Sequence, residues 1–223
     1  MTWVADNLDL IWGLTLDHLR QSLIAVFLGF VVALPIGWAA FRYSALRGPT
    51  LTTVGLLYTI PSLGLFAVLA AAFGIPLLSE ANLIVALTIY AVAIMTRSVA
   101  DGLAAIEPAT RAAAVAVGFG PWRRFWTVDL PLAGPVLLAG LRVTASSTIS
   151  LATVGILIGV QNLGYLFTNG FQRRIVAEVF AGVVAVVLVS VLIDLLLILA
   201  GRLLMPWNHR PSRRVRALRA VTA

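Results

Sequence analysis

The run SLIAVFLGFVVALPIGWAAF occupies residues 22–41 and contains no charged side chain. At a rise of about 1.5 Å per residue, about twenty helical residues cross the ~30 Å hydrocarbon layer of a membrane. The run is apolar at both odd and even positions, whereas a strand of a membrane barrel alternates apolar with polar side chains. This stretch therefore predicts a membrane-spanning helix.

Four further stretches repeat this pattern, at residues 51–73, 82–100, 135–159 and 179–205. The 223-residue chain is 61% apolar and 11% charged, whereas soluble domains are about 45–50% apolar and about 25% charged. The sequence thus predicts an all-α polytopic membrane protein with five spans, and its composition excludes a soluble globular domain.

The flanking segments give an expected orientation. Residues 1–21 carry three aspartates, one arginine and apolar side chains at helical spacing, which predicts an interfacial helix before the transmembrane domain of residues 22–205. All sixteen basic residues are arginines, and most follow the first span, follow the third span or lie in the tail at 206–223. The positive-inside rule therefore predicts an outer N-terminus and a cytoplasmic C-terminus, with the tail near anionic lipid rather than nucleic acid.

Enzymatic chemistry is not expected. The chain has no cysteine and two distant histidines, His18 and His209, so neither a thiol nucleophile nor a metal site is predicted. Asp194, a lone acid deep in the fifth span, is expected to make a structural contact. Arg97 and Asp101 lie four residues apart and are expected to pair on one helix face.

The segment DGLAAIEPATRAAAVAVGFGPWRRFWTVDLP, residues 101–131, is too polar for a span and too rich in alanine for a plain loop. Residues 109–117 have high helix propensity, and the glycines and proline at 118–121 end the pattern. These features predict a short cytoplasmic helix between the third and fourth spans. The segment could also be an ordinary interfacial helix.

The spacing in this segment resembles the EAA loop of bacterial ATP-binding-cassette import permeases, the type I binding-protein-dependent importers. Ala112-Ala113-Ala114, three residues, Gly118, nine residues, Val128, one residue and Leu130-Pro131 follow that pattern. The resemblance implies a coupling helix that docks onto a cytoplasmic ATPase dimer. The implied coupling residues are Arg111, Ala112, Ala113, Ala114, Gly118, Leu130 and Pro131. Ala112 replaces the family's glutamate, so Arg111 or Glu107 is expected to supply a polar contact.

Four other stretches are similar to permeases of osmoprotectant importers, which move glycine betaine, choline, carnitine or proline. They are LDHL at 16–19, YTIPSL at 58–63, TVG at 153–155 and LGYL at 163–166, although Gln161-Asn162 replaces the family's double glycine. The resemblance implies an extracytoplasmic solute-binding protein, a second permease copy or homologue, and a bacterial inner-membrane location. It implies no cofactor in this chain, because ATP and Mg²⁺ belong to the partner ATPase. The chain itself has no lysine, and so no phosphate-binding loop.

The expected translocation pathway is lined by Tyr58, Pro61 and Ser62 of the second span, where Pro61 predicts a kink. Thr144, Ser147 and Thr148 share one side of the fourth span and are expected to line the pathway as well. For these hydroxyls, helix packing is the alternative interpretation.

Three other functions remain open. The chain could be an importer permease for another small solute, such as an amino acid or a sulfonate. It could be a secondary transporter or channel that needs no ATPase, although neither an inverted repeat nor a pair of intramembrane charges is evident. It could also be a membrane scaffold that transports nothing.

Overall fold

The computed structural model describes residues 2–209, and this part of the chain is built from helices. The helices are α1 (Thr2–Asp6), α2 (Leu8–Arg42), α3 (Ser44–Thr59), α4 (Ser62–Phe73), α5 (Glu80–Ala104), α6 (Pro108–Ala116), α7 (Pro121–Arg124), α8 (Leu130–Ala152), α9 (Gly164–Gln172) and α10 (Val176–Leu204). A π-helical turn, η1 (Phe125–Asp129), precedes α8, and 3-10 turns occupy Thr153–Ile158 (η2) and Pro206–His209 (η3). The arginines predicted to form the basic tail lie beyond the described residues.

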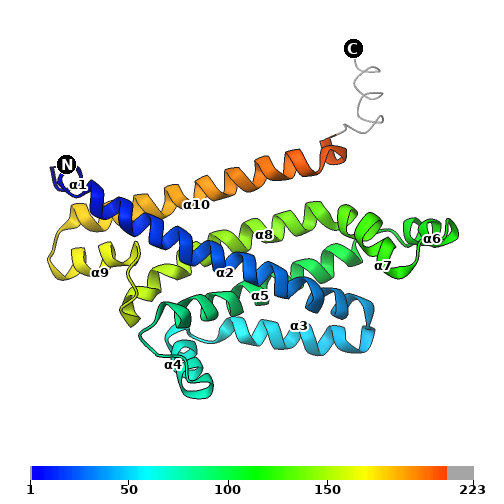
Figure 1. Ribbon diagram of the computed structural model, residues 1–223, viewed down its shortest axis with the longest axis horizontal. Coiled ribbons are helices and arrows are strands. Elements are labelled where there is room, and N and C mark those ends of the chain that lie inside the picture. The colour runs from blue at the N-terminus through cyan, green and yellow to red at the C-terminus, as the bar shows by residue number, and fades with distance from the viewer. Residues whose placement is uncertain (1, 210–223) are drawn as a thin grey trace, which may run out of the picture.

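The predicted all-helical membrane fold is confirmed, with four or five spans. Four stretches are long and apolar enough to cross a membrane by themselves, namely α2, α5, α10 and residues 121–158 around α8. The bent pair α3 and α4 makes a fifth span if it is counted as one. The long helices lie alongside one another, with α6 and α7 at one end of the bundle and α4 and α9 at the other (Figure 1).

Helices α2 and α5 approach closely because small residues recur along their interface. Gly29, Ala33 and Gly37 are spaced four apart on α2 and are all buried. A Cβ atom at Gly29 would lie 2.4 Å from the Cβ of Ala91, and one at Gly37 would lie 2.5 Å from the Cβ of Val99. Small residues at this spacing allow two membrane helices to pack backbone against backbone. This pair therefore forms the closely packed centre of the bundle.

The predicted kink at Pro61 is confirmed and is large, because α3 and α4 are bent by 107°. Proline has no N–H with which to continue the helical bonding, so α3 ends at Thr59. The Tyr90 hydroxyl donates a hydrogen bond to the freed Ile60 carbonyl at 2.5 Å, and the Leu65 N–H donates to the Pro61 carbonyl at 2.9 Å. The break is therefore held by specific bonds.

The N-terminal region differs from the expectation in one respect. Helix α2 runs from Leu8 to Arg42 without a break at residue 21, so residues 8–21 belong to the same helix as the first span. The physical reason is burial, because His18 and Gln21 of this segment are both within the chain interior. An interfacial helix would instead leave such polar groups in contact with water.

Candidate coupling site and translocation pathway

Helix α6 stands at the end of the bundle and buries none of its residues (Figure 1). It confirms the helix predicted at residues 109–117, with Pro108 at its first position, where the missing N–H costs nothing. Ala112 and Ala113 are exposed, and so are the larger side chains Val115 (54%) and Val117 (77%). An apolar helix left uncovered at the end of a bundle is typical of a protein-docking surface.

Gly118 ends α6 in a left-handed turn. Its φ is +91°, its N–H donates to the Val115 carbonyl at 2.9 Å, and the Phe119 N–H donates to the Ala114 carbonyl at 3.0 Å. These two bonds form a Schellman motif, which satisfies carbonyl groups that the helix end would otherwise leave unpaired. No atom lies within 4 Å of a Cβ built at this position. Glycine is therefore favoured here by backbone conformation rather than by lack of space.

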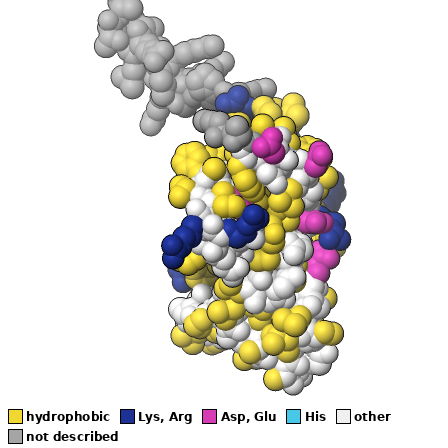
Figure 2. Space-filling model, turned by 90° about the vertical axis from the view of Figure 1, so that its left-hand side faces the viewer, with side chains coloured by type: hydrophobic (Ala, Val, Ile, Leu, Met, Phe, Trp, Pro, Cys, Tyr) yellow, Lys and Arg dark blue, Asp and Glu magenta, His cyan; other side chains and the backbone are white. Residues whose placement is uncertain are grey.

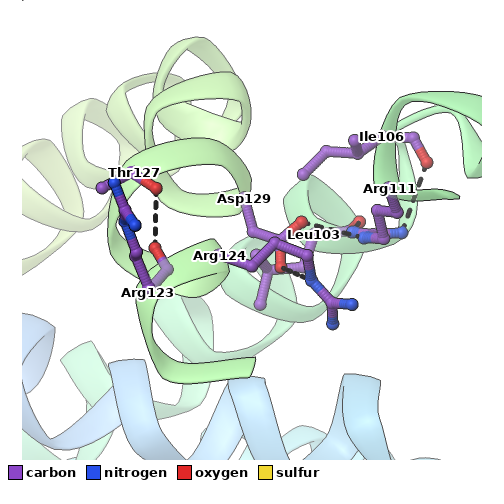
Figure 3. Close-up of polar contacts among 7 residues, drawn as sticks. All are labelled: Leu103, Ile106, Arg111, Arg123, Arg124, Thr127 and Asp129. Atoms are coloured by element: carbon purple, nitrogen blue, oxygen red, sulfur yellow. Dashed lines mark hydrogen bonds and ion pairs between the residues drawn. The ribbon is translucent and has the colours of Figure 1, made fainter. Parts of the chain in front are cut away.

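Arg111 fixes α6 to the bundle through a shared carboxylate (Figure 3). Its Nε donates to Oδ1 of Asp129 at 3.0 Å, and the Nε of Arg124 donates to Oδ2 of the same carboxylate at 3.2 Å. The Arg111 guanidinium also donates to the backbone carbonyls of Leu103, in the last turn of α5, and of Ile106, just after that helix. This group of three side chains, Arg111, Asp129 and Arg124, is called the coupling anchor below.

The coupling anchor is largely protected from solvent. The side chain of Asp129 is 4% exposed, and those of Arg111 and Arg124 are 17% and 22% exposed. The Cζ of Arg111 lies 4.5 Å from the centre of the Phe41 ring on α2. Arg111 thus joins α6 to three other parts of the chain, so its charge is directed inward. A direct contact between Arg111 and an ATPase stays a prediction. Glu107, the other residue expected to make such a contact, is exposed just before α6.

The Leu130-Pro131 pair explains where Asp129 lies. Proline lacks an N–H and its ring clashes with the carbonyl four residues before it, so the helix cannot enter α8 with regular bonding. The chain forms the π turn η1 instead, in which the Leu130 N–H donates to the Phe125 carbonyl five residues back. Asp129 is the last residue of this turn and faces Arg111 and Arg124. Two parts of the spaced motif thus have structural roles: Gly118 ends α6, and Leu130-Pro131 determines where Asp129 lies.

Residues predicted to line the pathway divide into two groups. Tyr58 is 47% exposed, Pro61 is exposed and Ser62 is half-buried, all near the break between α3 and α4. Thr144 and Thr148 are 0% and 1% exposed, and the Thr144 hydroxyl donates to the Gly140 carbonyl at 2.8 Å. In this conformation these two threonines pack against the chain's own helices. Of the three predicted residues on α8, only the half-buried Ser147 reaches the surface.

The predicted pair between Arg97 and Asp101 is wrong. Asp101 instead accepts a hydrogen bond from Arg47, with 2.9 Å between Oδ1 and Nη2. Arg47 reaches Asp101 because it lies in the first turn of α3, which packs alongside α5. Arg97 instead lines a cavity together with Tyr58.

The expectation that no intramembrane charges are paired is also wrong. Arg142 on α8 and Asp194 on α10 form a two-pronged ion pair, with N–O distances of 2.5 and 2.8 Å. The two residues are 52 positions apart, so spacing within a single helix could not reveal them. Asp194 makes the structural contact predicted for it. A lack of paired intramembrane charges is therefore no longer an argument against a secondary transporter.

The sequence did not predict a second polar network. It lies at the end of the bundle opposite α6, and this end faces the viewer in Figure 2. The Asn162 amide donates to the Ala152 carbonyl at 2.8 Å and to the Gln21 side chain at 3.1 Å, and Gln21 donates to the Gln161 carbonyl at 3.0 Å. A ring nitrogen of His18 lies 2.9 Å from the Ile149 carbonyl. The unusual Gln161-Asn162 pair, noted in the sequence, therefore ties the segment after α8 to α2.

Comparisons with known proteins place these features in a family context. Residues 18–210 match the family described as binding-protein-dependent transport system inner membrane component. The choline transport system permease protein OpuBB of Bacillus subtilis is 33% identical over 194 residues, covering 86% of this chain and 87% of that protein. The glycine betaine/carnitine/choline transport system permease protein OpuCB of the same organism is 31% identical over 208 residues, covering 92% and 94%. A chain of the inward-facing MetNI methionine ABC transporter superposes with a TM-score of 0.80 at 21% identity, covering 89% of this chain and 98% of that chain, which shows a shared fold.

Proposed function

Since this chain belongs to the family of binding-protein-dependent transport system inner membrane components, we propose that it is the permease subunit of an ATP-driven importer for osmoprotectants. The cargo class is that of glycine betaine, choline, carnitine and proline. The observation that carries this proposal is α6, an uncovered apolar helix held rigidly to the bundle by the coupling anchor. Such a helix can receive force from a partner and pass it to α5 and α8.

The force would come from a separate ATPase dimer that binds ATP and Mg²⁺. Docking would bury Ala112, Ala113 and the exposed valines of α6 in a groove of that partner. Because Arg111 connects α6 to the end of α5 and to Asp129 before α8, a displacement of α6 would be transmitted to two spanning helices at once. This connection would let the helices move as rigid bodies between inward-open and outward-open packings.

The cargo would be delivered by an extracytoplasmic binding protein, and a second permease copy or a homologue would complete the pathway. The protein would lie in a bacterial inner membrane with its N-terminus outside and its coupling helix in the cytoplasm. The two relatives named above support the cargo class, since both are permeases named for choline or for betaine, carnitine and choline.

The proposal is tested by uptake of radiolabelled glycine betaine, carnitine, choline and proline. The host is a bacterial strain without osmoprotectant importers that produces this chain with the ATPase and binding protein of its gene cluster. We expect uptake that needs all three components and stops when the ATPase is inactivated. Uptake by this chain alone, driven by an ion gradient in vesicles, would favour a secondary transporter. No flux of any solute under any pairing would favour a scaffold.

A further inference from the structure

A cavity of about 280 Å³ lies between α3 and α5, next to the α3 residues that precede the break at Pro61. Val54, Gly55 and Tyr58 line it from α3, and Ala93, Ile94, Arg97 and Ser98 line it from α5. Drug-sized ligands occupy pockets of about 300–1,000 Å³. This cavity therefore suits a smaller molecule.

Arg97 gives the cavity a fixed positive charge. It lies seven residues before the end of α5 at Ala104, which corresponds to about 10 Å of helix. It is exposed, and within residues 2–209 no carboxylate pairs with it, because Asp101 is taken by Arg47. A charged side chain inside a span is costly unless it meets an opposite charge or water, so such residues mark substrate pathways.

Tyr58 gives the same cavity an aromatic surface. Tyr58 is 47% exposed, and its ring makes an edge-to-face contact with Tyr90, with ring centres 5.9 Å apart at 89°. Tyr90 is itself held by its hydrogen bond to the Ile60 carbonyl at the helix break. An exposed aromatic ring attracts a quaternary ammonium through its π face, and this attraction increases when water is excluded.

We infer that Arg97 and Tyr58 form a subsite for betaines, with the carboxylate of the cargo on Arg97 and its trimethylammonium group against Tyr58. The inference rests on the proposed function and narrows its cargo class. Glycine betaine and carnitine carry both charges, whereas choline has the cation but no carboxylate. Choline gains nothing from Arg97 and is repelled by it, so the permease passes carboxylated cargo in preference.

The test compares maximal uptake rates at cargo concentrations that saturate the binding protein, with rates normalised to the amount of chain in the membrane. In Arg97→Gln we expect the rates for glycine betaine and carnitine to fall about tenfold or more, because a hydrogen bond to a charged group is lost. Choline uptake should stay the same or rise, and it also reports that the variant is folded. Arg97→Lys keeps the charge and should retain most glycine betaine uptake. Arg202→Gln, an exposed arginine in the last turn of α10, is the matched control and should behave as wild type.

Several results would overturn the subsite. These are an equal fall for choline and glycine betaine in Arg97→Gln, an unchanged glycine betaine rate in that variant, and loss of all glycine betaine uptake in Arg97→Lys. A wild-type complex that imports only choline would overturn this inference and leave the proposed function intact. A wild-type complex that imports none of the osmoprotectants would overturn both.

Discussion

Gly118 is the residue at which the coupling segment depends most on backbone conformation. Its φ of +91° lies in a region that costs residues with a Cβ atom about 1–2 kcal/mol. We expect Gly118→Ala to lower the uptake rate roughly fivefold or more by loosening the end of α6. Gly118→Asn should retain more activity, because asparagine tolerates left-handed conformations. Uptake normalised to membrane level measures both variants, and wild-type rates in both would contradict a conformational requirement.

Asp129 is the second residue on which α6 depends, since it neutralises two arginines while almost fully buried. Asp129→Asn leaves both guanidinium groups without a counter-charge, and removing one partner of a buried pair costs about 3 kcal/mol or more. We expect a lower Tm of the purified permease and loss of uptake. Thr127→Ala is the matched control, because this exposed hydroxyl only bonds the Arg123 carbonyl at 2.7 Å. An unchanged Tm in Asp129→Asn would show that the coupling anchor does not stabilise α6.

The sequence predicted the backbone of this site better than its side-chain contacts. Motif spacing located α6, its glycine end and the Leu130-Pro131 step, because each depends on local conformational preferences. The partner of Arg111 was not predicted, since it depends on how the π turn orients Asp129. One signal was available: Asp129 is the only acidic residue between Glu107 and Glu178. Arg111, Arg123 and Arg124 lie in the same segment, and Asp129 is the acid available there to neutralise them.

At the scale of elements, the ion pair between Arg142 and Asp194 joins α10 to the bundle. Little of α10 is buried within the chain, and this ion pair adds a polar link to the packing of α10 on α8 and α9. We expect Arg142→Leu and Asp194→Leu each to lower the Tm in detergent, because each leaves an unpaired charge in a span. The double leucine variant should be more stable than either single variant. Additive losses in the double variant would contradict a coupled pair, and the single exposed change Val143→Ala serves as control.

Hydropathy predicts spans well and their arrangement poorly, for a physical reason. Twenty apolar residues suffice to cross a membrane, and the runs at 82–100 and 179–205 accordingly match α5 and α10 within a few residues. The 107° bend at Pro61 was expected as a kink of unknown size, because its angle depends on the Tyr90 bond from another helix. The continuation of α2 before residue 22 was not predicted, because the polar residues His18 and Gln21 suggest a water-exposed segment. Their burial depends on hydrogen-bond partners in distant parts of the chain.

At the scale of the whole molecule, the absence of cysteine from the chain makes the docking of α6 directly measurable. A single Ala113→Cys places a thiol on the exposed side of α6, and Tyr43→Cys places one on another exposed residue, just after α2. We expect a membrane-impermeant maleimide to label both residues in inside-out vesicles that contain the permease alone. With the ATPase bound, Ala113→Cys should be protected and Tyr43→Cys should still react. Equal labelling of Ala113→Cys with and without the ATPase would mean that α6 is not the docking helix. Labelling only from the outer side of the membrane would reverse the proposed orientation.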